Sequence, residues 1–180
     1  MTDFDRDSYQ TPKDVFRWLD KRFHFDFDGC ASKENALCQC YCFDDGEGGF
    51  LTFDPFSYEC NVFKPKSIFI NPPYSNPKDF IERAVWWKEH NRLVVMLLPA
   101  DKTIEWYAII QQHANEVIDI IGYHDEKGTW RTGRLQFINP VTGKPAQGNN
   151  KGSMIVVFDP FIEGLVTRQM PLNKIKDWGK

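Results

Sequence analysis

Two consecutive prolines directly after an apolar run place the strongest constraint on how this chain folds. Residues 67–70 read Ser-Ile-Phe-Ile, a short run that is typical of a buried strand. Pro72 and Pro73 prevent that strand from continuing, because each ring fixes φ and neither residue has a backbone N–H to donate. The sequence therefore predicts a stiff turn at the end of a strand.

The residues around these prolines carry groups that suit a planar amine. Asn71 has a side-chain carbonyl that accepts hydrogen bonds, and Tyr74 has a flat aromatic face. Pro72 and Pro73 leave backbone carbonyls without neighbouring donors. This set fits a planar ring with an exocyclic amino group. The alternative interpretation is an ordinary strand-ending turn with a packed tyrosine, since these residue types are common in turns.

Length and charge limit the class of protein. A chain of 180 residues predicts one domain, 1–180, with a substantial core. The net charge of −3 gives no general attraction to nucleic acid, so any DNA binding has to come from local clustering of positive charge. We find no run of about 20 apolar residues and no secretion signal at residues 1–5. We therefore expect a cytoplasmic protein with no membrane partner.

The five cysteines are expected to be reduced thiols. Cys38, Cys40 and Cys42 alternate, so on a strand they would share one face. Zinc ligands usually come in pairs separated by two to four residues, which this run does not match; a site completed by Cys30 and Cys60 is the alternative. We expect small buried thiols and no metal, and the four histidines show no metal or triad spacing.

Strands and helices are expected to alternate along the chain. Helices are predicted to begin at Thr11-Pro12, with Thr11 as the cap, and at Asn76-Pro77, with a third over 103–113. Strands are predicted over 23–28, 37–43, 67–70, 92–98 and 116–121, followed by an antiparallel pair of 134–138 with 153–158. The basic C-terminal stretch, with Arg168, Lys174, Lys176 and Lys180, is interpreted as a solvated end, and a contribution to DNA binding is the alternative. This order indicates an α/β protein with a mostly parallel sheet, a C-terminal antiparallel hairpin and helices on both faces.

The two turns that follow predicted strands are expected to lie close together. In such sheets ligands bind beyond the carboxyl ends of the strands. The small-residue turn that starts at Asp28 and the turn that starts at Asn71 both fall at ends of this kind. We therefore expect a ligand site between them.

The chain is similar to the phage-type DNA N6-adenine methyltransferases, which use S-adenosylmethionine. The resemblance runs from about Tyr9 to Asp159 and depends on an ordered set of motifs. These are Thr11-Pro12, the segment FDGCAS at 27–32, Asn71-Pro72-Pro73-Tyr74-Ser75, LLPA at 97–100 and TGRLQF at 132–137. It implies a Rossmann-like methyltransferase fold and methylation of adenine N6 in DNA, in a phage-encoded protein that protects DNA from restriction in the bacterial cytoplasm.

The same resemblance implies a role for individual residues. Catalysis would fall to Asn71, Pro72, Pro73 and Tyr74: the Asn71 oxygen and the Pro72 carbonyl would each accept one N6 hydrogen of a flipped adenine, and Tyr74 would stack on that base. Cofactor binding would involve Thr11, Pro12, Asp28, Gly29, Cys30, Ala31, Asp54 and Asn71, with Asp44 or Asp45 on the ribose. The chain has only Gly29 where many methyltransferases have Gly-x-Gly, so the backbone contacts there stay open.

A basic segment around 123–152 is the expected DNA contact. From Lys127 to Lys151 there is no acidic residue, and the candidates for DNA binding are Lys127, Trp130, Arg131, Arg134, Lys144 and Lys151. A solvated hairpin and loop is the alternative. For the whole protein, two further functions stay open: methylation of cytosine N4 or protein glutamine, and a non-catalytic DNA-binding or anti-restriction protein on the same fold.

Overall fold

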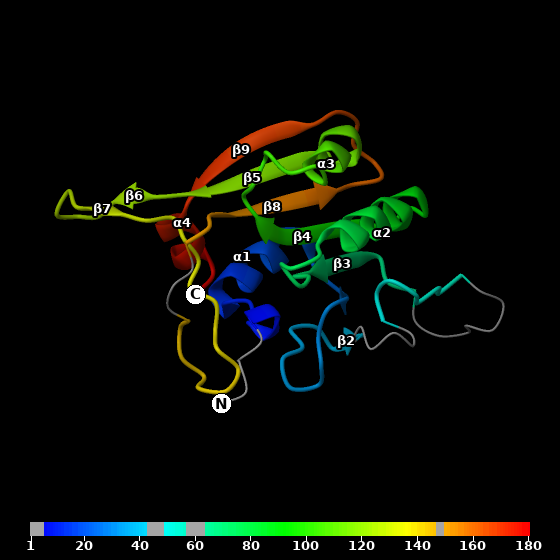
Figure 1. Cartoon of the computed structure of the whole chain (residues 1–180), viewed down its shortest axis with the longest axis horizontal. Helices are drawn as coiled ribbons and strands as arrows, with labels where there is room; N and C mark the ends of the chain where they lie inside the picture. Colours follow the sequence, from blue (N-terminus) through cyan, green and yellow to red (C-terminus); the bar gives the residue numbers. More distant parts are fainter. Residues whose placement is uncertain (1–5, 43–48, 57–63, 147–149) are drawn as a thin grey trace.

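A seven-stranded mixed sheet forms the centre of the computed structural model, which describes residues 6–42, 49–56, 64–146 and 150–180. The strands follow the order β2-β1-β3-β4-β8-β5-β9 (Figure 1). Their bounds are β1 Phe27–Asp28, β2 Cys40–Tyr41, β3 Ser67–Ile70, β4 Leu93–Pro99, β5 Glu116–Ile121, β8 Ser153–Phe158 and β9 Val166–Pro171. Strand β8 runs antiparallel to both of its neighbours, and all other adjacent strands are parallel.

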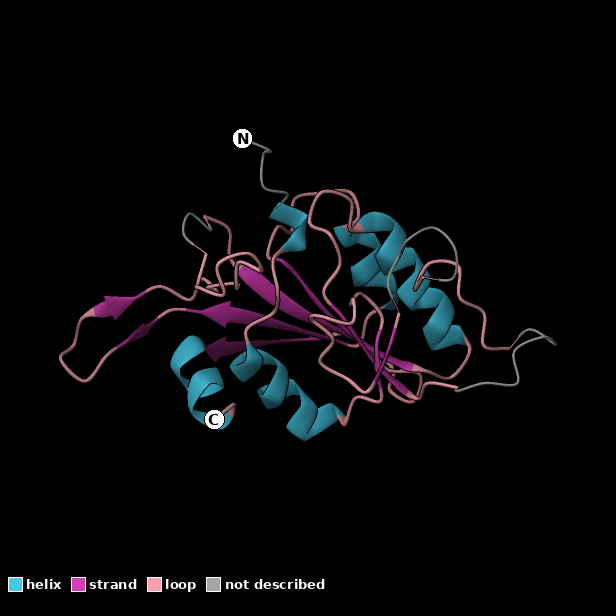
Figure 2. Ribbon diagram, turned by 90° about the horizontal axis from the view of Figure 1, so that it is seen from below, coloured by secondary structure: helices cyan, strands magenta, loops and turns pink. Residues whose placement is uncertain are grey.

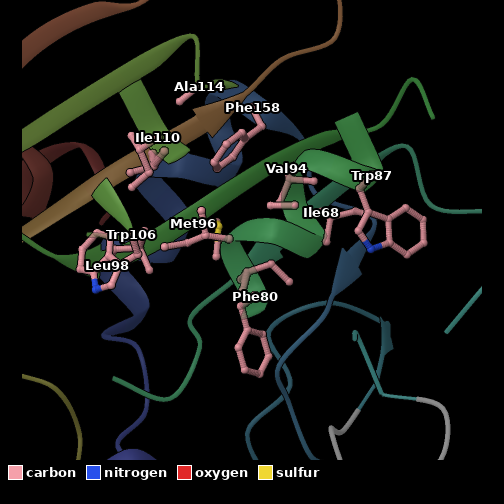
Figure 3. Packing of buried hydrophobic residues seen from close by; sticks show 14 of the residues in the cluster. Ile68, Phe80, Trp87, Val94, Met96, Leu98, Trp106, Ile110, Ala114 and Phe158 are labelled. Atoms are coloured by element: carbon pink, nitrogen blue, oxygen red, sulfur yellow. The ribbon is translucent and has the colours of Figure 1, made fainter. Parts of the chain in front are cut away.

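Helices cover both faces of this sheet (Figure 2). Helices α1 (Lys13–Phe23) and α4 (Leu172–Trp178) pack on one face, and α2 (Lys78–Glu89) and α3 (Tyr107–His113) pack on the other. Strand β4 shows how alternation divides the core: Met96 faces α2 and α3 (Figure 3), whereas Leu97 faces α1 and α4. None of the helices in the described part of the chain is long and apolar enough to cross a membrane.

The predicted α/β architecture is confirmed, with the sheet mostly parallel and helices on both faces. Strands were expected over 67–70, 92–98 and 116–121, and β3, β4 and β5 lie there. Helices α1 and α2 begin directly after Pro12 and Pro77, although no side chain caps either of them. Thr11 is therefore not a cap; it is buried beside a cavity described below.

The strands near the N-terminus are shorter than predicted. Strand β1 has two residues, because α1 continues to Phe23 and His24 then takes a left-handed conformation with φ 51°. Phe25 packs on the α1 and α4 face, whereas Phe27 packs on the opposite face. Strand β2 is also shorter than predicted and consists of Cys40–Tyr41.

The start of one helix differs as well. Helix α3 begins four residues later than the predicted position 103.

Two expectations about the C-terminal half are wrong. Segment 134–138 does not pair with 153–158; Ile138 forms bridges with Gln10 and Pro145, and β8 lies between β4 and β5. All six residues of β8 are buried, as expected for a central strand whose two faces are both covered by helices. The C-terminal stretch is also not a solvated end, since β9 pairs with β5 and α4 buries Leu172 and Ile175.

Candidate active site

The Asp28 and Asn71 turns lie side by side at one edge of the sheet. Strands β1 and β3 are parallel neighbours with Asp28 opposite Phe69, so the two segments leave the sheet at the same end. A cavity of about 390 Å³ opens there. Its lining combines residues expected from the sequence (Thr11, Asp28, Cys30, Asn71 and Pro73) with the N-terminal residues Asp7, Ser8, Tyr9 and Gln10.

Asn71 presents an acceptor that no described part of the protein uses. Its Oδ1 atom is buried and has no hydrogen-bond partner among the described residues. No described residue donates a hydrogen bond to the Pro72 carbonyl either. A buried acceptor left unpaired costs about 1–3 kcal/mol, so it indicates a site completed by a ligand. Two oxygens beside a proline-fixed bend suit a ligand with N–H donors.

Tyr74 is anchored at both its ring and its backbone. The ring makes an edge contact with Phe137 at a centroid distance of 5.7 Å, and its hydroxyl end is buried although the residue as a whole is half-buried. Burial raises the pKa of Tyr74 well above its usual value, so the phenol stays neutral. The Ser153 hydroxyl lies near enough to offset part of that rise, but no hydrogen bond of normal geometry joins the two groups.

Asp28 is a buried carboxylate with a strongly perturbed titration. Its side chain accepts hydrogen bonds from the backbone N–H groups of Cys30 at 3.3 Å and Leu37 at 3.1 Å. Burial raises the pKa of Asp28 to about 6, and these two hydrogen bonds oppose the rise. A carboxylate that titrates near neutral pH in the wall of a cavity is a candidate for a functional role.

A second cavity of about 670 Å³ adjoins the first. It lies between the start of α1, the loop 34–37 and the segment 135–145, and it is lined by Pro12 and Lys176 among others. Thr11, Glu34 and Asn35 line both cavities, so the two are adjacent and are called the cleft below. Together they place Thr11 and Pro12 beside the Asp28 turn.

Not all residues predicted to bind the cofactor line this cleft. Gly29 is absent from its walls, and a Cβ there would lie 2.3 Å from Ile70 Cδ1, so packing requires the glycine. Ala31 is buried away from the cleft. Asp54 is exposed, accepts a hydrogen bond from Phe56 N and lines neither cavity. The expected ribose ligands, Asp44 and Asp45, lie outside the described residues.

Sequence reasoning missed several residues of the cleft. Glu34 and Asn35 follow the Asp28 turn in a polar stretch, where Asn35 Oδ1 accepts the Ser32 N–H at 2.7 Å. That run of polar residues after a strand end was a usable signal. Asp7 gave no such signal, because it reaches the site by a contact that is distant in sequence.

The six residues predicted to bind DNA are all exposed. Lys127, Trp130 and Arg131 belong to a separate hairpin of β6 (Tyr123–His124) and β7 (Trp130–Arg131) that extends beyond the sheet (Figure 1). The Trp130 side chain is 60% exposed, and Arg131 pairs with Asp125 at 2.8 Å. Arg134, Lys144 and Lys151 follow on the segment that returns to β8.

Four of the five cysteines lie in the described part of the chain. Cys30, Cys38, Cys40 and Cys42 are partly buried and are not joined in disulfides, and burial raises the pKa of the Cys38 thiol to about 12. Within the described ranges, no group of three His, Cys, Asp or Glu side chains is arranged to hold a metal ion. That the protein needs no metal stays a prediction.

Comparison with known proteins identifies the family. The family model "DNA N-6-adenine-methyltransferase (Dam)" matches residues 1–177. A DNA N-6-adenine-methyltransferase of Escherichia phage T1 is 36% identical over 182 residues, covering 94% of this chain and 71% of the phage protein. Another from Haemophilus phage HP1 (strain HP1c1) is 33% identical over 180 residues, covering 97% and 92%. The expected resemblance is confirmed: this chain belongs to the DNA N-6-adenine-methyltransferase (Dam) family.

Proposed function

We propose that this enzyme transfers a methyl group from S-adenosylmethionine to N6 of an adenine flipped out of DNA, and that the cleft between the Asp28 and Asn71 turns is its active site. The observation that carries this proposal is the buried Asn71 Oδ1, an acceptor without a partner in the described protein at the wall of the cavity. Family membership supports the proposed reaction, and the geometry of the cleft supports the proposed position of the active site.

The residues of the cleft fit the proposed cofactor. S-adenosylmethionine supplies a methyl group activated on a positively charged sulfur. Asp28 offers a buried carboxylate that suits the ammonium group of its methionine part, and Thr11 lies in the same wall. Pro12 lines the adjoining cavity, and both volumes lie in the usual range of small-molecule sites, about 300–1,000 Å³.

Asn71 and Pro72 make the target amine reactive. The lone pair of adenine N6 is delocalised into the ring, which makes the amine a poor nucleophile. When Asn71 Oδ1 and the Pro72 carbonyl each accept one N6 hydrogen, the nitrogen is drawn towards tetrahedral geometry. As the new N–C bond forms and the S–C bond of the cofactor breaks, S-adenosylhomocysteine would be the leaving group, and the same oxygens would stabilise the positive charge on nitrogen until one N6 proton passes to solvent water. Because the prolines fix the bend in advance, little reorganisation is needed.

The hairpin and the returning segment are proposed to hold the DNA. Lys127, Arg134, Lys144 and Lys151 are exposed cations suited to phosphates, and Trp130 offers an exposed aromatic face. Flipping the base costs a few kcal/mol, and stacking on Tyr74 recovers about 1–3 kcal/mol. We place this activity in the bacterial cytoplasm, where it protects phage DNA from restriction.

Nucleoside analysis of treated DNA tests the proposal. The wild-type enzyme with methyl-labelled S-adenosylmethionine should produce N6-methyladenine, and Asn71→Ala should lower the rate by about 10²- to 10³-fold, as expected when one preorganised polar contact is lost. DNA binding should persist in that variant. Asn76→Ala is the control, because this exposed asparagine donates a hydrogen bond to Asp79 and lines neither cavity.

Other outcomes would contradict specific parts of the proposal. If the product were N4-methylcytosine, the substrate would be cytosine and not adenine. DNA binding without any methylated nucleoside in the wild type would favour the non-catalytic alternative. An Asn71→Ala enzyme with full activity would move the active site elsewhere.

A further inference from the structure

The segment that precedes α1 lies directly against the Asn71 turn. Asp7 belongs to the short 3-10 helix Arg6–Ser8, and its Oδ1 accepts the backbone N–H of Tyr74 at 3.0 Å and of Ser75 at 3.2 Å. The first of these contacts joins residues 67 positions apart in the chain. Asp7 also lines the same cavity as Asn71.

This contact holds the one side of the turn that the sheet does not hold. Before Asn71 the chain is fixed by β3, whose residues pair with β1 and β4. After Asn71 come two prolines, which have no N–H to donate. Tyr74 and Ser75 therefore provide the first backbone donors downstream, and a single carboxylate oxygen accepts from both. Hydrogen bonds to a charged acceptor are about twice as strong as neutral ones.

The segment that carries Asp7 is anchored three residues further along the chain by a separate contact. Gln10 and Ile138 exchange two backbone hydrogen bonds, at 2.9 and 3.0 Å. Phe137, the neighbour of Ile138, makes the edge contact with the Tyr74 ring. The segment before α1 is therefore attached to the protein at Gln10 as well as at the Asn71 turn.

We propose that Asp7 is a positioning residue for methyl transfer: it fixes the direction of the Asn71 and Pro72 oxygens, and so controls the rate of the chemical step more than the binding of cofactor or DNA. This proposal rests on the role proposed above for Asn71. A displacement of about 1 Å at a reacting group can cost about 100-fold in rate.

Two substitutions at Asp7 and one matched control test this role. Asp7→Ala should lower kcat about 100-fold, with the Kd for S-adenosylhomocysteine within about threefold of wild type. Asp7→Asn keeps an uncharged oxygen that can accept the same N–H groups, so kcat should recover to about three- to tenfold below wild type. Asp26→Ala is the control, because Asp26 accepts the N–H groups of Lys66 and Ser67 at the opposite end of β3. It should lower the Tm and leave kcat nearly unchanged.

Each result supports or overturns the proposal. A kcat for Asp7→Ala within threefold of wild type, or equal losses in kcat and cofactor affinity, would overturn it. Equal kcat values for Asp7→Asn and Asp7→Ala would do the same. If Asp7→Ala does not fold, Asp7→Asn decides: a reduced kcat at unchanged cofactor Kd supports positioning, and a wild-type kcat contradicts it. An active Asn71→Ala enzyme would remove the proposed site itself, whereas an inactive one beside an active Asp7→Ala would remove only the role of Asp7.

Discussion

Among single residues, Asp28 is buried at a cost in stability that a ligand can offset. Its carboxylate is 3% exposed, and burial raises its pKa from 3.8 to about 6. The folded state therefore favours the protonated carboxyl. The contribution of this proton to the free energy of unfolding is complete below pH 3.8 and is lost as pH rises through about 6. At neutral pH, keeping the ionised carboxylate buried lowers the free energy of unfolding by about 3 kcal/mol. A cationic ligand at Asp28 recovers part of that free energy.

This titration predicts a pH dependence of cofactor binding. The Kd for S-adenosylhomocysteine should fall as pH rises from about 5 to 7.5, because Asp28 becomes ionised and attracts the ligand's ammonium group. In Asp28→Asn the affinity should be lower and nearly independent of pH over that range. Isothermal titration calorimetry of both proteins measures the effect, and the same slope in both would show that a different group titrates.

Residues differ in how far their roles could be predicted from the sequence. Asn71 was predictable because the following prolines and the preceding apolar run are adjacent in sequence. Asp7 was not, because its partners lie far along the chain and any of the nearby acidic residues looked equivalent. Gly29 was assigned to the cofactor by the resemblance, and the structure adds a packing reason for a glycine there, because a Cβ would lie too close to Ile70 and Phe50. Packing partners of this kind depend on the tertiary fold.

At the scale of elements, a buried glutamate joins α1, β5 and β9. Glu116 is 6% exposed and binds Arg22 through two hydrogen bonds, of 3.2 and 2.6 Å. Arg168 on β9 reaches the same carboxylate at 2.9 Å. Most side chains of β9 are exposed, so this edge strand lacks the apolar pattern that reveals central strands. That is why the C-terminal stretch was misjudged.

Removing the charge at Glu116 should loosen this junction. Glu116→Gln is expected to lower the free energy of unfolding by about 2 kcal/mol, since charged hydrogen bonds contribute about 1.5–3 kcal/mol. Arg168→Ala should cost less than about 1 kcal/mol, because its side chain is mostly exposed. Urea denaturation measures both, and equal effects would argue against a central role for the glutamate.

The hairpin and the returning segment should act on DNA through charge. Lys127→Ala and Lys144→Ala should each weaken binding at all sequences and reduce the slope of log K against log salt by about 0.9. Lys64→Ala is the control, since Lys64 is exposed and precedes β3, at the opposite end of that strand from the Asn71 turn. Fluorescence anisotropy at several salt concentrations measures the slopes. Unchanged slopes in the two variants would exclude phosphate contacts there.

For the whole molecule, the fold class followed from the sequence more fully than the strand order did. Alternating strands and helices predicted a two-faced α/β sheet, because the apolar runs and proline-started helices are local signals. The position of β8 between β4 and β5 was not predicted, since a fully apolar strand fits any central place equally well. Short β1 and β2 were overestimated because alternation of residue types also occurs in irregular segments.

The two cores on opposite faces of the sheet should unfold together. Ile175 is fully buried on the α1 and α4 face, so Ile175→Ala should cost about 2–5 kcal/mol. Because both cores share the strands of one sheet, tryptophan fluorescence and far-UV circular dichroism should still report a single urea transition. Separate transitions for the two probes would show that residues 1–180 do not behave as one domain.

The late place of β8 in the chain has a consequence for synthesis. Residues 93–121 leave the ribosome before β8, so β4 and β5 wait with the edges that β8 will later occupy still unpaired. At about 5–20 residues per second the wait lasts seconds. During that time a nascent chain exposes apolar strand edges that favour association with other chains. Slow translation between positions 121 and 153 would therefore lower the yield of native enzyme, and chaperones that shield strand edges would raise it.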